Sequence, residues 1–440
     1  MGVQQFAAIS RAISLPYSTL ENLKQLAPHI KVNVYFDGSL YLFRGYLSKT
    51  IRSDGTSNSR LVAQYSHDKI INMIKNLNSI TINKVYIYFD GERPALKLRT
   101  IKKRQKTGTI KSNTSGATFG KEKVNKLEVQ NILTDLLNPY PYIEIKHLTR
   151  GEGEHEIFLR RDRSLPSIIF TDDSDLYHIS YDYEQASFND YVFMGSTQFT
   201  FVNLFLISTH FKLPRYAFVL LMMLRGADFT NSLFTLTMVN SIIQSFRSTP
   251  NDILIQKYIQ KIREIDQKYK YVEHNVQVFN QRLPPQTRNE ITNDNENTNM
   301  VIMYDYIYSL EDIYKTIRYF LLILLNQEIY TRVNWNVQQK NKKFDSTIHN
   351  MFNEITCLWW STNYSTIGVR FKEYGNNQFT YTENLSPFSF YTMIITHTYE
   401  EFTALLDKES LKKQPRQFNF SFEEFKKSKS FFADRYKDVA

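Results

Sequence analysis

Three short hydrophobic runs in the N-terminal half of the chain each end in acidic residues. They are Val32–Gly38 (VNVYFDG), Val85–Gly91 (VYIYFDG) and Ile168–Asp175 (IIFTDDSD), and they are rich in β-branched and aromatic residues. Runs of this length and composition predict buried β-strands. A fourth run, Tyr142–His147, predicts another strand, which leads into the acidic sequence Gly151–Glu154.

Helix-like spacing of hydrophobic residues fills much of the chain around these runs. It covers Ser66–Leu77, Phe201–Leu224 and Ile255–Tyr269. Strands that alternate with helices predict an α/β fold with a mostly parallel central sheet flanked by helices, here followed by a helical or mixed C-terminal extension. Ligands of such sheets bind at the carboxyl ends of the strands, which is where the acidic residues fall.

Polar segments suggest the domain boundaries. We predict a core over residues 1–240, a helical extension over 241–283, a linker over the Asn-rich segment 284–299 and a C-terminal domain over 300–440. No segment reaches the roughly 20 hydrophobic residues that span a bilayer, and the N-terminus lacks a signal-peptide pattern. We therefore expect a soluble intracellular protein with no membrane partner. The single cysteine, Cys357, excludes a disulfide framework.

Positive charge is concentrated in one segment. The chain has 54 Lys and Arg against 44 Asp and Glu, a formal net charge of +10. Residues 97–126 hold ten of the basic residues and one acid, so the rest of the chain is nearly neutral. Such a segment favours a polyanionic partner. Within it, Lys97 and Arg104 are seven residues apart and would share one helix face, pointing toward the acids near Asp90.

Seven carboxylates lie where strands end, where a helix is expected to begin or, in one case, directly after a long predicted helix. They are Asp37, Asp90, Glu152, Glu154, Asp173, Asp175 and Asp228. Each one alone would more often be a helix cap or a turn residue. Asp173 and Asp175 are expected to share a face, because side chains alternate along a strand, and carboxylates held close together repel unless a cation is bound. The set therefore suggests a metal site.

The ligand chemistry narrows the choice of metal. Carboxylate oxygens without His or Cys favour Mg²⁺ or Mn²⁺ over zinc. Seven acids exceed the needs of one ion and suit two, which would activate a water molecule and stabilise the leaving oxygen of a phosphodiester. The sequence has no phosphate-loop, dinucleotide-binding, zinc-protease or nucleophile-elbow motif, so competing chemistries have no candidate.

The order and spacing of these residues resemble the superfamily of the flap endonucleases and the XRN 5′→3′ exonucleases, from Met1 to about Leu233. The resemblance implies a PIN-like, flap-endonuclease-like core, with the seven acids as metal ligands. It also implies that Lys97 and Arg104 contact the scissile phosphate as catalytic residues.

The resemblance further implies where nucleic acid binds. Phe43 stands where flap endonucleases stack an aromatic ring on a base, and the chain start with Gly2 would fold beside the active site. Residues 97–126 would form an arch or gateway through which a free 5′ end passes. Further contacts to nucleic acid would come from Lys102, Lys103, Lys106 and Lys111.

Each subfamily is matched in part. The sequence Gly151–Ile157 (GEGEHEI) and the opening MGVQQF resemble XRN proteins, whereas the short intervals from Glu154 to Asp173 and from Asp175 to Asp228 resemble flap endonucleases. A chain with both features looks like the nucleases encoded by large DNA viruses, which would place it in the nucleus or at a cytoplasmic replication site of an infected cell.

We therefore expect a Mg²⁺-dependent 5′ nuclease that cuts branched or single-stranded DNA near free 5′ ends during replication, repair or recombination. One alternative is an XRN-like 5′→3′ exoribonuclease. The other is a non-catalytic nucleic-acid-binding scaffold that acts through residues 300–440, a segment without a catalytic motif. The sequence identifies no protein partner.

Overall fold

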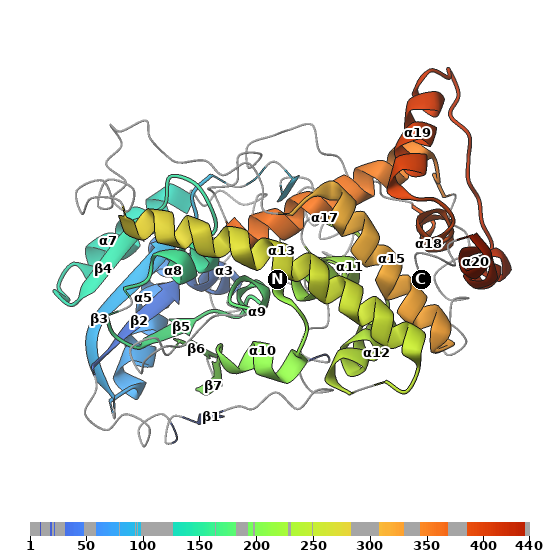
Figure 1. Ribbon diagram of the computed structural model, residues 1–440. Helices are drawn as coiled ribbons and strands as arrows, with labels where there is room; N and C mark the ends of the chain where they lie inside the picture. Colours follow the sequence, from blue (N-terminus) through green and yellow to red (C-terminus); the bar gives the residue numbers. More distant parts are fainter. Residues whose placement is uncertain are drawn as a thin grey trace. The chain divides into compact units, whose positions relative to one another are not determined.

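The computed structural model divides into two compact units (Figure 1). The first comprises Met1 and Leu15–Ile207, and the second combines Gly2–Ser14 with Ser208–Ala440. The structure describes residues 9, 18–19, 22, 31–47, 59–78, 80–92, 94, 96–97, 126–162, 164–181, 192–196, 199–227, 230–248, 250–282, 308–329, 344–367 and 385–435. The predicted linker lies outside these ranges. No helix within them is long and apolar enough to cross a membrane.

A parallel sheet forms the centre of the first unit. Strand β2 (Lys31–Asp37) pairs in parallel with β3 (Thr81–Phe89) on one side and with β5 (Ser167–Phe170) on the other. Beyond these, β4 (Ile143–His147) and β6 (Val192–Gly195) continue the parallel pairing. The prediction of an α/β fold with a mostly parallel sheet is confirmed.

An antiparallel edge completes the sheet. Its strands are β7 (Thr200–Asn203), which pairs with β6, and the short β1 (Ser18–Thr19). Among the described strands the order is β1-β7-β6-β5-β2-β3-β4. The prediction of helix from Phe201 onward is wrong for its first residues, which belong to β7. The helices there are α10 (Leu206–Phe211) and α11 (Arg215–Arg225).

Three helices cover one face of the sheet over a hydrophobic core. They are α3 (Gly38–Leu47), α5 (Ser59–Asn76) and α7 (Lys126–Leu137), with α5 packed against both others. Because side chains alternate along a strand, this core takes every second residue of the central strands. Those residues are Val32, Val34, Phe36, Val85, Ile87, Phe89, Ile168 and Phe170.

The opposite face of the sheet carries the intervening residues. Tyr35 and Tyr86 stack there with ring centroids 5.0 Å apart, and helix α8 (Gly153–Arg160) contacts both β2 and β3. The same alternation assigns Asp37 at the end of β2 and Asp90 just after β3 to this face. Both acids therefore point away from the hydrophobic core and toward α8.

The second unit is built of helices around α11. Every residue of α11 from Tyr216 to Arg225 is buried, because α12, α13 and α17 pack against it. The further helices are α12 (Leu236–Arg247), α13 (Ile253–Arg282), α15 (Leu310–Asn326), α17 (Ile348–Ile367), α18 (Pro387–Thr396), α19 (Tyr399–Ser410) and α20 (Phe422–Arg435). The predicted C-terminal extension is thus helical where the structure describes it.

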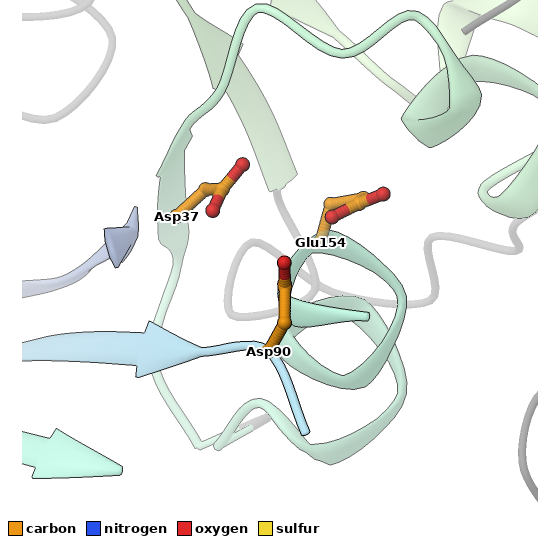
Figure 2. Close-up of side chains that lie close together, drawn as sticks. All are labelled: Asp37, Asp90 and Glu154. Carbon is orange, nitrogen blue, oxygen red and sulfur yellow. The ribbon is translucent and has the colours of Figure 1, made fainter. Parts of the chain in front are cut away.

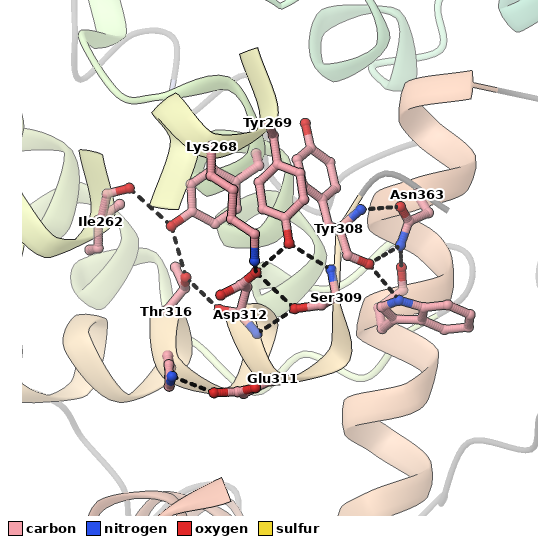
Figure 3. Close-up of polar contacts among 12 residues, drawn as sticks. Ile262, Lys268, Tyr269, Tyr308, Ser309, Glu311, Asp312, Thr316 and Asn363 are labelled. Carbon is pink, nitrogen blue, oxygen red and sulfur yellow. Dashed lines mark hydrogen bonds and ion pairs between the residues drawn. The ribbon is translucent and has the colours of Figure 1, made fainter. Parts of the chain in front are cut away.

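A polar network joins α13 to the start of α15 (Figure 3). The Asp312 carboxylate accepts hydrogen bonds from Lys268 Nζ at 2.9 Å, from Ser309 Oγ at 2.8 Å and from the Tyr269 hydroxyl. Burial would raise the pKa of Asp312, but these hydrogen bonds and the Lys268 charge hold it below its usual value. These hydrogen bonds offset the free-energy cost of burying the Asp312 carboxylate.

A second buried carboxylate holds the loop that follows α11. Glu354 on α17 is fully buried, and its two oxygens accept from the Asn231 backbone N–H at 3.1 Å and from Asn231 Nδ2 at 2.7 Å. Burial raises the pKa of Glu354 from 4.5 to about 7, and the hydrogen bonds from Asn231 only partly oppose this. Glu354 is therefore neutral over part of the range in which a solvated glutamate is charged.

This pKa shift predicts a pH-dependent stability. Because the folded-state pKa of Glu354 lies above its ordinary value, the carboxyl group stabilises the folded protein fully below about pH 4.5. This stabilisation is lost as the pH rises through 7. Relative to Glu354→Gln, which has no such titration, the native protein should lose about 3 kcal/mol of stability between these pH values. Urea unfolding of both proteins across this range measures the difference.

Asp312→Asn is the matched control, because the pKa of Asp312 is lowered rather than raised. The native protein should lose stability relative to Asp312→Asn as the pH falls, which is opposite to the pH dependence expected for Glu354. Parallel stability curves for the native protein and Glu354→Gln would contradict the assignment.

Candidate metal centre

The ends of β2 and β3 bring two aspartates close to the start of α8 (Figure 2). Asp37 accepts from the Leu40 backbone N–H at 3.1 Å, which fixes it at the start of α3. Asp90 accepts from the Gly153 N–H at 2.8 Å. With Glu154 they form a first group of carboxylates, whose ligand oxygens all lie within 4.8 Å of one another.

A second group consists of Glu154, Asp173 and Asp175, again with oxygens within 4.8 Å of one another. The expectation that Asp173 and Asp175 share a strand face is wrong in its reason, because β5 ends at Phe170. Asp175 instead begins helix α9 (Asp175–Ile179) and donates its backbone N–H to Asp173 Oδ1 at 3.1 Å. A turn, rather than strand alternation, brings the two acids together.

Glu154 belongs to both groups and lies between them. Burial, together with the charges of Glu152, Asp173 and Asp37, raises its pKa well above the usual value. Burial and the charge of Asp90 likewise raise the pKa of Asp37 to about 7. Burial is the largest cause of both shifts and repulsion between the acids adds to it, so a bound cation would stabilise the ionised carboxylates.

Gly153 leaves open the space in which the first group meets. A Cβ atom at this position would lie 3.3 Å from Asp90 Oδ1 and 3.5 Å from Asp37 Oδ1. The absence of a side chain therefore keeps a cradle of carboxylate oxygens clear at the first turn of α8. Positively polarised N–H groups at a helix start also favour negative charge there.

Two further predicted residues, Lys97 and Glu152, form a buried ion pair. Lys97 donates to Glu152 Oε1, and both side chains are buried. Lys97 was predicted to point, with Arg104, toward the acids near Asp90; its ammonium contacts Glu152, and Arg104 lies outside the described residues. Glu152 lies immediately before α8 and outside both groups of clustered oxygens.

Two further contacts were not anticipated from the sequence. His178 is buried with Nδ1 3.9 Å from Asp175 Oδ1, and burial lowers its pKa to about 4, so it stays neutral beside the acid. Asp172, next to the clustered Asp173, points elsewhere and forms an ion pair with Arg44 of α3. The prediction singled out Asp173 and Asp175 among the acids of TDDSD, but nothing in the sequence indicated that Asp172 pairs with Arg44.

The structure leaves several other predicted residues untested. Phe43 is exposed on α3, which leaves its predicted stacking on a base untested. The others lie outside the described residues: Gly2, Lys102, Lys103, Arg104, Lys106, Lys111 and Asp228.

The clustered groups fit a hard divalent cation. Their ligands are carboxylate oxygens alone, without His or Cys, a set that favours Mg²⁺ or Mn²⁺. The cradle kept clear by Gly153 and the raised pKa values of Asp37 and Glu154 indicate the same. The arrangement can therefore bind positive charge at the carboxyl edge of the sheet.

No protein-family model and no curated protein matches the sequence. Among solved structures, the chain aligns with the catalytic core of Rad2 in complex with a DNA substrate at a TM-score of 0.38 and 16% identity, over 75% of this chain and 99% of that one. It aligns with the D15 protein of T5, co-crystallised with metal ions, at a TM-score of 0.31 and 14% identity, over 54% of this chain and 85% of that one. It also aligns with the bacteriophage T5 D15 flap endonuclease in a pseudo-enzyme–product complex with DNA and metal ions. That alignment has a TM-score of 0.33 and 14% identity, and it covers 54% of this chain and 85% of that one. Structural similarity this low does not indicate a function. The chemistry of the centre is inferred from this chain's own residues.

Gly153→Ala tests whether the cradle binds a cation. The added methyl group must displace the carboxylate of Asp90 by a few tenths of an ångström, so Mn²⁺ affinity should fall roughly tenfold, as is typical when ligand positions are disturbed. Stability in EDTA should stay equal or rise, because Ala favours a helix over Gly by up to about 1 kcal/mol. Calorimetric Mn²⁺ titration and thermal unfolding measure the two effects. Unchanged Mn²⁺ affinity would exclude this space as the metal site.

Proposed function

We propose that this chain is a Mg²⁺-dependent 5′ nuclease that hydrolyses phosphodiesters near free 5′ ends of branched or single-stranded DNA. The observation that carries the proposal is the pair of carboxylate groups that share Glu154, beside the buried Lys97. The order of the acids along the chain, which resembles that of flap endonucleases and XRN proteins, supports it. Roles in DNA replication, repair or recombination follow from the same resemblance.

The proposal assigns each group of acids to one ion. Asp37, Asp90 and Glu154 would hold the first, and Glu154, Asp173 and Asp175 the second. When bound, two such ions supply an activated water molecule and charge stabilisation for the leaving oxygen. Because Glu154 belongs to both groups, it would help to hold both ions.

The chain's own cations would orient the substrate. Lys97 has the charge and the location to bind the phosphate next to the acids. By resemblance Arg104 acts with it, and the basic segment 97–126 guides the free 5′ end. Asp228 is proposed as a further ligand on the same ground.

A non-catalytic scaffold is the less favoured function. Burying several carboxylates together costs free energy, and a chain without metal chemistry would gain nothing from keeping them. The sequence Gly151–Ile157 still favours an RNA substrate as the second candidate. A strong dependence of cleavage on a 5′-monophosphate of RNA, with little cleavage of flap DNA, would select that alternative.

Asp173→Asn tests the proposal. It removes one oxygen ligand with little change in volume, and cleavage of a 5′-flap DNA in Mg²⁺ should fall ~100-fold or more, which corresponds to several kcal/mol of lost transition-state stabilisation. Single-turnover cleavage with protein in excess measures the rate of the chemical step.

Asp172→Asn is the matched control, since it makes the same change at the neighbouring residue, which pairs with Arg44 instead. Its cleavage rate should stay within a few-fold of that of the native protein. Equal rates for the two variants would rule out Asp173 as a metal ligand. Absence of any cleavage by the native protein would rule out the nuclease.

A further inference from the structure

Lys97 and Glu152 neutralise each other beside the two carboxylate groups. Lys97 is 8% exposed and Glu152 4% exposed, and the ammonium donates to Glu152 Oε1. Glu152 precedes the shared ligand Glu154 by only two residues, yet it belongs to neither group of clustered oxygens. An acid only two residues from the centre of the site is thus engaged with the chain's own cation.

The charge of Lys97 also acts on the proposed ligands. Burial raises the pKa of Glu154, and Lys97 opposes this only in small part, whereas the pKa of Asp173 lies below its usual value although burial alone would raise it, and Lys97 is one of the charges that lower it. An ammonium in this position partly neutralises the acids, as a bound metal ion would. Lys97 and a divalent ion therefore compete for the same negative potential.

Separating the ion pair requires a new partner for the ammonium. Breaking a buried ion pair costs several kcal/mol, so an anion that takes the place of Glu152 beside the ammonium would stabilise the separated state. In the proposed reaction that anion is a phosphate of the nucleic acid, which lysine binds as a point charge. Arrival of the substrate would therefore free Glu152 at the moment when the metal ions are needed.

We infer that Lys97 withholds Glu152 from metal until a substrate phosphate takes over the ammonium, so that metal binding and substrate binding are coupled. This inference rests on the proposed function and adds a regulation of the same site. By linkage, the substrate raises the metal affinity and the metal raises the substrate affinity by the same factor. The ion pair thus keeps metal occupancy low in the free protein.

Lys97→Met tests the coupling, because it removes the charge and keeps an unbranched side chain. Without nucleic acid, this variant should bind Mn²⁺ roughly tenfold more tightly than the native protein, since Glu152 is released. Isothermal titration calorimetry measures this affinity without cleavage. The control is Lys84→Met, which removes the same charge from an exposed pair with Glu144 at 3.7 Å in the same unit, and which should leave Mn²⁺ affinity unchanged. Equal or weaker Mn²⁺ binding by Lys97→Met overturns the inference.

A double variant separates the release of Glu152 from the simple loss of a positive charge. Lys97→Met with Glu152→Gln has the net charge of the native protein, and its Mn²⁺ affinity should return to the native value. A gain that persists in the double variant would overturn the inference, because it could not come from Glu152. Thermal unfolding in EDTA checks that each variant is folded.

These measurements also separate two kinds of failure. A native protein that binds no Mn²⁺ contradicts the proposed function itself. A native protein that binds Mn²⁺ and cleaves flap DNA, while Lys97→Met shows no gain in affinity, contradicts only the coupling.

Discussion

The candidate metal centre depends on holding like charges together at the edge of a sheet. Left alone, the carboxylates of Asp37, Asp90 and Glu154 would repel and separate, and the backbone prevents this. The N–H groups of Leu40 and Gly153 bind two of them, and the parallel strands deliver them to one edge. The sheet and the first turn of α8 thus hold an arrangement that a cation would favour.

The positions of the first acids could be predicted from the sequence because one rule governs them. Strands of a parallel sheet end at the same edge, and alternation decides the face. Asp37 and Asp90 each follow a hydrophobic run, so their convergence required only the correct assignment of the strands. The start of α8 at Gly153, directly after Glu152, was also visible as an acidic helix start.

Other features depend on contacts that no local pattern encodes. Strand β7 is four residues long and adjoins helical sequence, so its hydrophobic residues resembled a helix. The turn that joins Asp173 to Asp175 depends on a backbone hydrogen bond, and the choice of Asp172 as partner of Arg44 depends on tertiary packing. The helices beyond residue 300 carry hydrophobic spacing but no motif, so their packing could be found only from the structure.

The second unit is closed by contacts between residues far apart in the chain. Asn231 binds Glu354, 123 positions later, and the hydroxyl of Tyr391 donates to the carbonyl of Leu233 across 158 positions. Contacts at such separation slow folding, because long loops must close first.

During synthesis the first unit has all its described strands once Ile207 has left the ribosome. Helix α11, buried in the finished protein, packs against α17 as well as α12 and α13, so its hydrophobic side chains stay uncovered during synthesis until residues 348–367 have been made.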